Sequence, residues 1–224
     1  LVKAVARTQA AAKKILGAAK PADADEAEAW KRSVEFAGQI EQYNQHALFG
    51  SAVKQTTPQA KILLLDTLRK NYPGGVFEKA IDAQYVVAYQ QIGDGVKLVQ
   101  AAEAALVHEP DNEAYLFLVA DSWVDPAKNR LAESQALAEK ILNTLPAKPK
   151  PAQIADADWE KHKSAYLGLG RSVLGRSLAN QGKNAPAHKE LLAAAAALKG
   201  NNDALAPVYF YLGFVSAKLE RRKD

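Results

Sequence analysis

The sequence predicts an all-α fold, and three observations support this prediction. Ala is abundant, with runs such as Ala193–Ala197, and it has the highest helix propensity of any residue. Apolar residues recur at helical spacing in most segments, while the period-two alternation of strands is almost absent. Gly and Pro lie between these segments, where they end one helix and permit the turn to the next.

Composition excludes several classes of protein. The chain has 224 residues, which is enough for one or two domains, and it is 48% hydrophobic and 24% charged, as folded globular proteins are. It has no Cys, so it can form neither a disulfide nor a Cys-based metal site. The longest apolar run, Leu191–Leu198, is far too short for a transmembrane segment. No signal peptide is visible, and the start at Leu1 indicates a processed or trimmed chain.

The charge is unevenly distributed along the chain. The net charge is +4, which mildly favours acidic partners. Residues 1–20 contain five basic and no acidic residues, and residues 23–28 contain four acidic and no basic ones. Such blocks usually form solvent-exposed helix faces and ends, so we do not expect a nucleic-acid or membrane-surface function from them.

The first third of the chain predicts three helices. Residues 1–18 form a short amphipathic helix that Pro21 interrupts. A long helix then runs from Ala24 to Lys54, and its acidic first turn suits the helix dipole. Thr57-Pro58 starts the next helix, with Thr as the N-cap and Pro at the first helical position. The run Asn71-Tyr72-Pro73-Gly74-Gly75 ends it.

The rest of the chain predicts seven further helices. Asp125-Pro126 is again an N-cap followed by Pro, and Asp156 caps a long helix. Residues 146–155 are rich in Pro and Lys and predict an extended inserted loop. The last helix has no partner, so we interpret it as a capping helix or a point of trimming. The predicted bounds are Val76–Gly93, Val96–His108, Glu113–Val124, Ala127–Thr144, Asp156–Leu178, Ala187–Leu198 and Ala204–Arg222.

One motif in the long C-terminal helix is the most informative part of the chain. Residues 174–187 read Leu-Gly-x-x-Leu-x-x-x-Gly-x-x-x-x-Ala. This is the spacing of a helix, a tight turn and the start of a second helix packed against the first. Further matches to the same template are Tyr89-x-x-x-Gly93 with Pro110, Tyr115 with Leu118, and Tyr209 with Leu212 and Gly213.

These motifs resemble the tetratricopeptide repeat (TPR), a helix pair of about 34 residues. The resemblance covers residues 76–222 well and residues 24–73 only by helix lengths and breaks. It implies a right-handed α-α superhelix of about four helix pairs plus a terminal helix, in a single domain over residues 1–224. Residues 1–20 would be a separate N-terminal helix. The alternative is a non-repetitive helical bundle with the same periodicity.

We find no constellation of residues that suggests catalysis, so we do not expect an enzyme, a metal or a cofactor. None of the four His residues has the His-Glu-x-x-His spacing that places two metal ligands on one helix face. Gly168 and Gly170 lack the spacing and the preceding strand of a phosphate-binding loop. Ser172 and Ser177 lack the Gly-x-Ser-x-Gly motif of a nucleophile elbow.

In TPR proteins the first helix of each pair lines a concave groove that binds a peptide or a protein. In this groove Arg176 offers a charged fork for carboxylates, and Asn180 can both donate to and accept from backbone amides. The alternative for Arg176 and Asn180 is that they are ordinary polar surface residues. Trp123 is either an aromatic anchor or a core residue, and the same alternative holds for Phe214. The groove residues that the resemblance implies are Gln90, Gln91, Trp123, Ser172, Arg176, Asn180, Phe214 and Lys218.

The resulting hypothesis is a non-catalytic interaction scaffold that binds a protein or peptide partner in its groove. A second hypothesis is an assembly subunit of a bacterial cell-envelope complex that is held by its helix ends, and a homo-oligomer is compatible with it. A third is a basic nucleic-acid binder that uses residues 1–20 or Arg221-Arg222-Lys223. The partner is not readable from the sequence. The compartment is either the cytoplasm or, with a slight preference, the bacterial periplasm.

Overall fold

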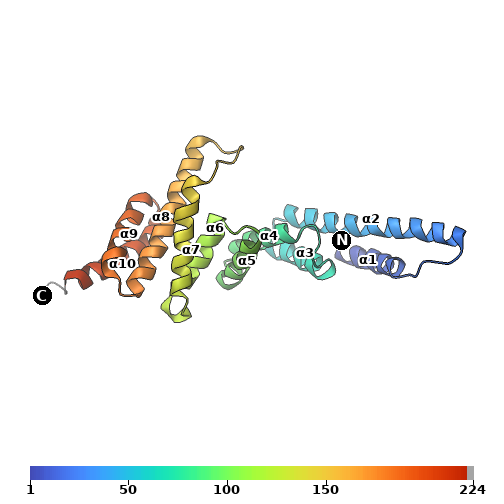
Figure 1. Cartoon of the computed structure of the whole chain (residues 1–224), viewed down its shortest axis with the longest axis horizontal. Helices are drawn as coiled ribbons and strands as arrows, with labels where there is room; N and C mark the ends of the chain where they lie inside the picture. The colour runs from blue at the N-terminus through green and yellow to red at the C-terminus, as the bar shows by residue number, and fades with distance from the viewer. Residues whose placement is uncertain (221–224) are drawn as a thin grey trace. The chain divides into compact units, whose positions relative to one another are not determined.

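The computed structural model describes residues 1–220, in which helices are joined by turns and loops and no strand occurs (Figure 1). The chain divides into two compact units, Leu1–Ala101 and Ala102–Asp224. The predicted all-α class is therefore confirmed, whereas the single domain stays a prediction. The helices are α1 (Val2–Leu16), α2 (Ala24–Lys54), α3 (Pro58–Asn71), α4 (Glu78–Ile92), α5 (Gly95–His108), α6 (Glu113–Trp123), α7 (Leu131–Thr144), α8 (Asp156–Asn180), α9 (Asn184–Ala197) and α10 (Asn202–Glu220).

Most helices begin and end within three residues of the predicted positions, and α2 matches its predicted bounds. The clearest exception is α7, which was predicted to start at Ala127 and starts at Leu131. Asp125 does accept a hydrogen bond from the backbone N–H of Ala127, but the capped segment is only a 3-10 turn, η1 (Pro126–Lys128). Asn129 then adopts a left-handed conformation (φ 52°), which stops this turn before α7 begins.

Two smaller differences concern the loop before α8 and the end of the chain. A second 3-10 turn, η2 (Leu145–Ala147), occupies the start of the predicted inserted loop. Asp156 is the first residue of α8 rather than its cap, because Ala155 holds the N-cap position. The predicted end of the last helix at Arg222 lies outside the described residues.

The N-terminal unit is a series of helices in which α1 packs on α2, α2 on α3, and α3 on α4. Leu48 of α2 and Leu65 of α3 are fully buried in it. Polar side chains also link its helices: Thr8 and Asn44 are hydrogen-bonded at 2.9 Å, and the side-chain amide of Gln9 donates to the carbonyl of Asn71 at 2.8 Å. The unit therefore has a core of its own with a few buried polar links.

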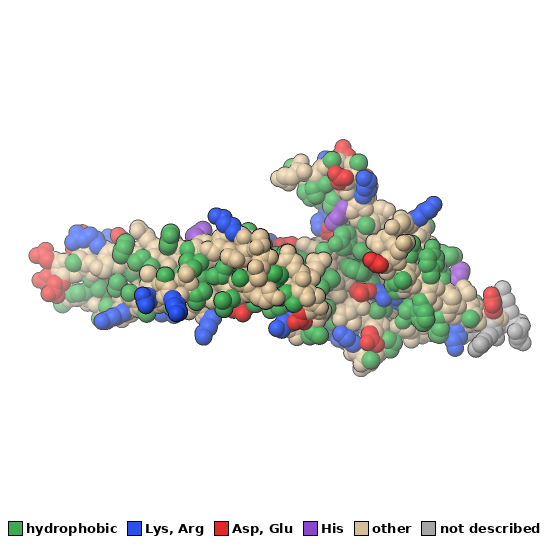
Figure 2. Space-filling model, turned by 180° about the vertical axis from the view of Figure 1, so that it is seen from behind, with side chains coloured by type: hydrophobic (Ala, Val, Ile, Leu, Met, Phe, Trp, Pro, Cys, Tyr) green, Lys and Arg blue, Asp and Glu red, His purple; other side chains and the backbone are tan. Residues whose placement is uncertain are grey.

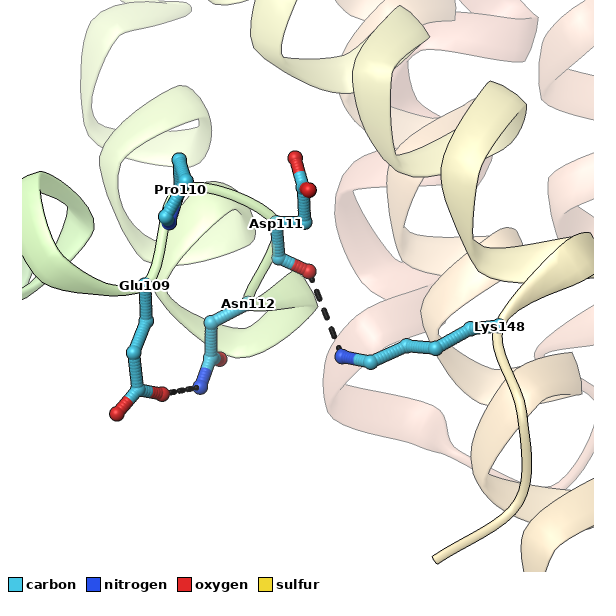
Figure 3. A pocket seen from close by; sticks show the side chains of 5 residues that line it. All are labelled: Glu109, Pro110, Asp111, Asn112 and Lys148. Carbon is cyan, nitrogen blue, oxygen red and sulfur yellow. Dashed lines mark hydrogen bonds between the residues drawn. The ribbon is translucent and has the colours of Figure 1, made fainter.

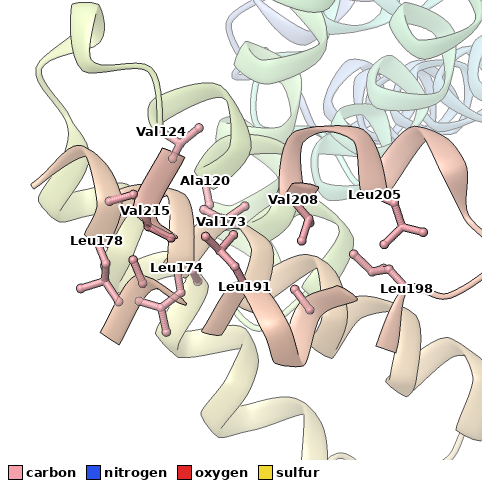
Figure 4. Packing of buried hydrophobic residues seen from close by; sticks show 14 residues of the cluster. Ala120, Val124, Val173, Leu174, Leu178, Leu191, Leu198, Leu205, Val208 and Val215 are labelled. Carbon is pink, nitrogen blue, oxygen red and sulfur yellow. The ribbon is translucent and has the colours of Figure 1, made fainter. Parts of the chain in front are cut away.

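In the C-terminal unit each helix contacts the next, and alternate helices also meet. α7 packs on both α6 and α8, and α9 packs on both α8 and α10, while α8 also contacts α6 and α10. Ser134 of α7 links three helices, because its hydroxyl donates to the carbonyl of Ala120 at 2.8 Å and lies 3.1 Å from the hydroxyl of Ser177. Figure 4 shows apolar side chains of α6, α8, α9 and α10 meeting in one buried cluster.

Two glycines of α8 allow α9 to approach closely. A Cβ atom on Gly175 would lie 2.6 Å from Cγ of Leu191, and one on Gly168 would lie 2.8 Å from Cγ of Leu198. Both leucines belong to the buried cluster. The small residues in the sequence of α8 therefore serve helix packing, as expected for glycines at a close helix contact.

Charged side chains gather on parts of the surface. Figure 2 shows Lys and Arg side chains projecting along the N-terminal unit, and acidic side chains grouped at one end of it. The five basic residues of positions 1–20 are all exposed. Within residues 1–220, none of the helices combines the length and the apolar character that crossing a membrane requires.

Candidate functional site

Two of the predicted groove residues line a surface hollow of about 460 Å³ in the C-terminal unit. Ser172 and Arg176 lie on the same face of α8, four residues apart. The hollow is formed by α6, α8, the turn before α10 and the first turns of α10. Its lining residues are Phe117, Asp121, Leu169, Ser172, Arg176, Asn201, Asp203, Ala204 and Pro207.

Arg176 is already paired in this hollow. Its guanidinium forms a salt bridge with Asp121 of α6, whose carboxylate is half exposed while the Arg176 side chain is largely buried. The Nε atom of Arg176 is buried and has no hydrogen-bond partner. Buried donors without an acceptor are rare in folded proteins. Arg176 therefore presents a neutralised charge to the hollow, and its unmatched Nε donor lies buried behind the surface.

The other groups around the hollow are of mixed character. Ser172 is buried, and its hydroxyl makes no side-chain hydrogen bond among the described residues. Asp203 is exposed in the first turn of α10 and has no ion pair within residues 1–220. Phe117, Leu169 and Pro207 provide apolar surface. With one neutralised pair and one free carboxylate, the local charge is negative.

Asn180 lies one turn beyond Arg176 on α8, and its side-chain amide is used inside the protein. The nitrogen donates to the carbonyl of Val124 at 3.0 Å, and the oxygen accepts a hydrogen bond from the hydroxyl of Tyr211 at 3.2 Å. These contacts link α8 to the end of α6 and to α10. In this structure Asn180 therefore holds three helices together.

The remaining predicted groove residues lie elsewhere. Trp123 is half-buried with the guanidinium of Arg130 stacked 3.3 Å from its ring centre. Phe214 and Lys218 are exposed on α10, and the ammonium of Lys218 lies 5.6 Å from the Phe214 ring. Gln90 and Gln91 are exposed at the end of α4, in the other unit. The structure thus brings Ser172 and Arg176 together in one hollow, with Asn180 next to them.

A second polar cluster surrounds Glu113 at the start of α6. This buried carboxylate accepts a hydrogen bond from the ammonium of Lys148 at 2.6 Å and lies 2.5 Å from Nε2 of His162 on α8. Since a carboxylate can only accept, this imidazole nitrogen carries the proton. The His162 ring is sandwiched between Trp159 and Tyr166, at centre distances of 5.1 and 4.7 Å.

The environment of Glu113 shifts its ionisation. Burial by itself raises the pKa of a carboxyl group, but the hydrogen bonds from Lys148 and His162 outweigh burial and hold the pKa of Glu113 below its usual value of 4.5. Burial, reinforced by the Glu113 charge, raises the pKa of the Tyr166 hydroxyl. Glu113 is thus an ionised carboxylate that fixes the start of α6 to the loop and to α8.

Lys148 also reaches the turn that precedes α6. Figure 3 shows its ammonium pointing at the backbone carbonyl of Asp111, at 3.4 Å, and Asn112 donating to the carboxylate of Glu109 at 2.9 Å. Together with Pro110 these residues line a shallow hollow of about 210 Å³. The inserted loop of residues 146–155 is therefore held at this turn through Lys148.

Sequence reasoning missed Asp121 and the Glu113 cluster. Asp121 and Arg176 are 55 residues apart, and Glu113 and His162 are 49 residues apart. No spacing of nearby residues in the sequence predicts such pairs, because their members meet only through the packing of helices. Within the described residues, no group of three or more His, Asp or Glu side chains is arranged to hold a metal ion.

Comparison of the chain with protein-family models, with curated proteins and with solved structures finds no match in any of the three. The resemblance to the tetratricopeptide repeat is therefore carried by the motifs of this sequence alone.

Proposed function

We propose that this protein is a non-catalytic, TPR-like interaction scaffold that binds a peptide segment of a partner protein in the hollow beside Arg176. In this proposal the helices of the C-terminal unit form successive turns of a right-handed superhelix. α6, α8 and α10 are the first helices of their pairs, and α7 and α9 are the second.

The order of helix contacts supports the superhelix. α8 contacts α6 and α10, while α7 and α9 each pack against the two first helices that flank them in sequence. This is the contact pattern of stacked helix pairs that share one continuous core. The template glycines add support, because Gly93 and Gly182 both adopt left-handed conformations, with φ of 78° and 75°, in the turns after α4 and α8.

The unpaired polar groups in the hollow support a peptide as ligand, and this observation carries the proposal. A peptide bond offers one N–H donor and one carbonyl acceptor. Its carbonyl would accept from the Ser172 hydroxyl, and its N–H would donate to the half-exposed carboxylate of Asp121. A neighbouring side chain of the peptide would pack against the apolar surface of Phe117, Leu169 and Pro207.

Local charge favours a neutral or basic peptide over an acidic one. The net charge of +4 suggested acidic partners, but Arg176 is neutralised by Asp121 and Asp203 adds a free carboxylate at the rim. Interactions between exposed charges fade over about 10 Å at moderate salt. The charged groups at the hollow therefore interact with a bound peptide more strongly than distant lysines do.

The test is selection of binding peptides from a random library displayed against the immobilised chain, followed by NMR mapping of the selected peptide. We expect selected peptides to be enriched in Lys or Arg and to shift the amide signals of residues 169–176 and 201–207. Failure to select any peptide, or shifts confined to other helices, would refute the proposal.

A charge reversal at the rim provides the specific variant. Asp203→Lys should weaken binding of a basic peptide about tenfold, since it replaces an attraction at the hollow with a repulsion. Asp158→Lys is the matched control, because Asp158 is also an exposed aspartate in the first turn of a long helix, α8, but lies outside the hollow. Arg176→Glu and Asn180→Ala are unsuitable tests, because both residues hold helices together.

A further inference from the structure

One face of α10 is apolar, exposed and free of charge. The fourteen residues from Ala204 to Ala217 contain no charged side chain. Three aromatic side chains on this stretch are exposed: Tyr209 by 58%, Phe210 by 71% and Phe214 by 43%. Ala206, Gly213 and Ala217 are exposed beside them. These six residues are called the α10 face below.

The equivalent face of α8 shows what kind of element covers such a surface. The shared Leu-Gly motif aligns Leu174-Gly175 of α8 with Leu212-Gly213 of α10, an offset of 38 residues. The side of α8 that carries Ser177 is buried, and so is its counterpart on α10 at Val215. The two helices differ on the opposite side: Gly175 is covered by Leu191 of α9, whereas a Cβ atom added to Gly213 would meet no packed neighbour within 4 Å.

We propose that the α10 face binds the α10 face of a second copy of this chain, antiparallel and about a twofold axis. If the axis passes between Tyr211 and Leu212, each large exposed residue meets a complementary one. Phe210 then lies opposite Gly213 of the other copy, as Leu191 lies on Gly175 within the chain. The same axis places Tyr209 opposite Phe214, and Ala206 opposite Ala217.

Self-complementarity is the property that a twofold interface requires, because the same surface serves both copies. The charged residues of α10 that the structure describes, Asp203, Lys218 and Glu220, lie at the two ends of the helix. A crossing at its centre therefore places Lys218, whose ammonium lies 5.6 Å from the Phe214 ring, at the border of the contact and no charged residue at its middle.

The area of the face sets the expected strength. The three exposed aromatic side chains contribute on the order of 100 Å² each, so two copies would bury about 600 Å² of aromatic surface and, with the small residues beside them, at most about 1,000 Å², the size of a weak, transient interface. We therefore expect a reversible dimer with a Kd of about 10–100 µM, measured by sedimentation equilibrium of the full chain.

Phe210→Asp places a charge at the centre of the face and should raise the Kd at least tenfold. Phe36→Asp is the matched control, because Phe36 on α2 is 60% exposed and should leave the dimer unchanged. Both residues are exposed, so both variants should keep the helical circular dichroism of the parent. A chain that is monomeric over the whole concentration range would overturn the proposal, and so would a dimer that Phe210→Asp does not weaken.

A swap of the two central residues distinguishes this antiparallel pairing from non-specific hydrophobic association of the face. Phe210→Gly alone leaves a gap opposite Gly213 of the other copy, and Gly213→Phe alone creates a clash with Phe210 of the other copy. Each single substitution should therefore weaken the dimer. The double variant Phe210→Gly/Gly213→Phe restores one large and one small residue across the axis and should recover most of the affinity. Additive weakening in the double variant would overturn the antiparallel pairing. Binding of a monomeric chain to lipid vesicles would likewise overturn it, by assigning the face to a membrane surface.

Discussion

Glu113 shows how a single residue can connect three segments of the C-terminal unit. It is the first residue of α6, and its buried carboxylate binds Lys148 of the loop and His162 of α8. Removing one partner from a buried hydrogen-bonded group is costly, because the groups left behind lose their partner without regaining water. The contacts of Glu113 should therefore matter more than those of the exposed ion pairs elsewhere in the chain.

Glu113→Gln removes the charge and keeps the size of the side chain. We expect the free energy of unfolding to fall by about 1–3 kcal/mol, because Lys148 and His162 lose an anionic acceptor. Urea unfolding followed by circular dichroism measures this difference. Glu35→Gln is the control, since Glu35 is exposed on α2 and forms no ion pair or side-chain hydrogen bond among the described residues. A Glu113→Gln variant as stable as the control would contradict the assigned role.

The same residue predicts a dependence of stability on pH. The folded protein holds the pKa of Glu113 below its usual value of 4.5, so the unfolded state binds the proton more tightly. The stabilisation by Glu113 is then fully present above about pH 5 and is lost as the pH falls through the lowered folded pKa. The difference in stability between the parent and Glu113→Gln should shrink as the pH falls below about 4.5. A difference that grows on acidification would contradict this sign.

At the scale of elements, glycine packing gives α8 and α10 opposite responses to the same substitution. Gly175→Ala would bring a Cβ atom within 2.6 Å of Leu191, so we expect a net loss of about 1–2 kcal/mol despite the better helix propensity of Ala. Gly213→Ala, at the equivalent position of α10, meets no atom within 4 Å and should gain about 0.5–1 kcal/mol.

Urea unfolding in dilute solution, where self-association is negligible, tests this pair. Each substitution is the control of the other, because both replace a helical glycine by Ala at the same place in the motif. Equal changes in the free energy of unfolding would mean that α9 does not pack on α8 at Gly175 as described.

Helix bounds were largely predictable from the sequence, because caps, Gly and Pro act locally. Asn71-Tyr72-Pro73 ends α3 as expected, and the all-α class follows from composition and periodicity. The start of α7 was not predictable in the same way, because Asp125-Pro126 opens a 3-10 turn as readily as an α-helix. The surroundings of the candidate site lay beyond sequence reasoning, since Asp121 meets Arg176 only through the packing of α6 on α8.

At the scale of the whole molecule, each of the two compact units buries apolar side chains of its own helices. Leu191 of α9 is fully buried and packs in a cluster whose members all come from α6 to α10. The N-terminal unit buries residues of its own helices, such as Leu48 and Leu65. In an array of helices stabilised by neighbour contacts, damage should spread to adjacent helices and fade with distance along the chain.

Leu191→Ala tests this property of the molecule. It should cost about 2–5 kcal/mol locally, because it leaves a cavity over Gly175. In hydrogen exchange followed by mass spectrometry, amides of α8, α9 and α10 should exchange faster, while those of α1, α2 and α3 should keep their parental rates. Leu192→Ala is a close control, since Leu192 is the next residue on α9 and is exposed. If α1–α3 exchanged as fast as α8–α10 in Leu191→Ala, the chain would unfold as one cooperative body. The division into two units would then describe its contacts but not its stability.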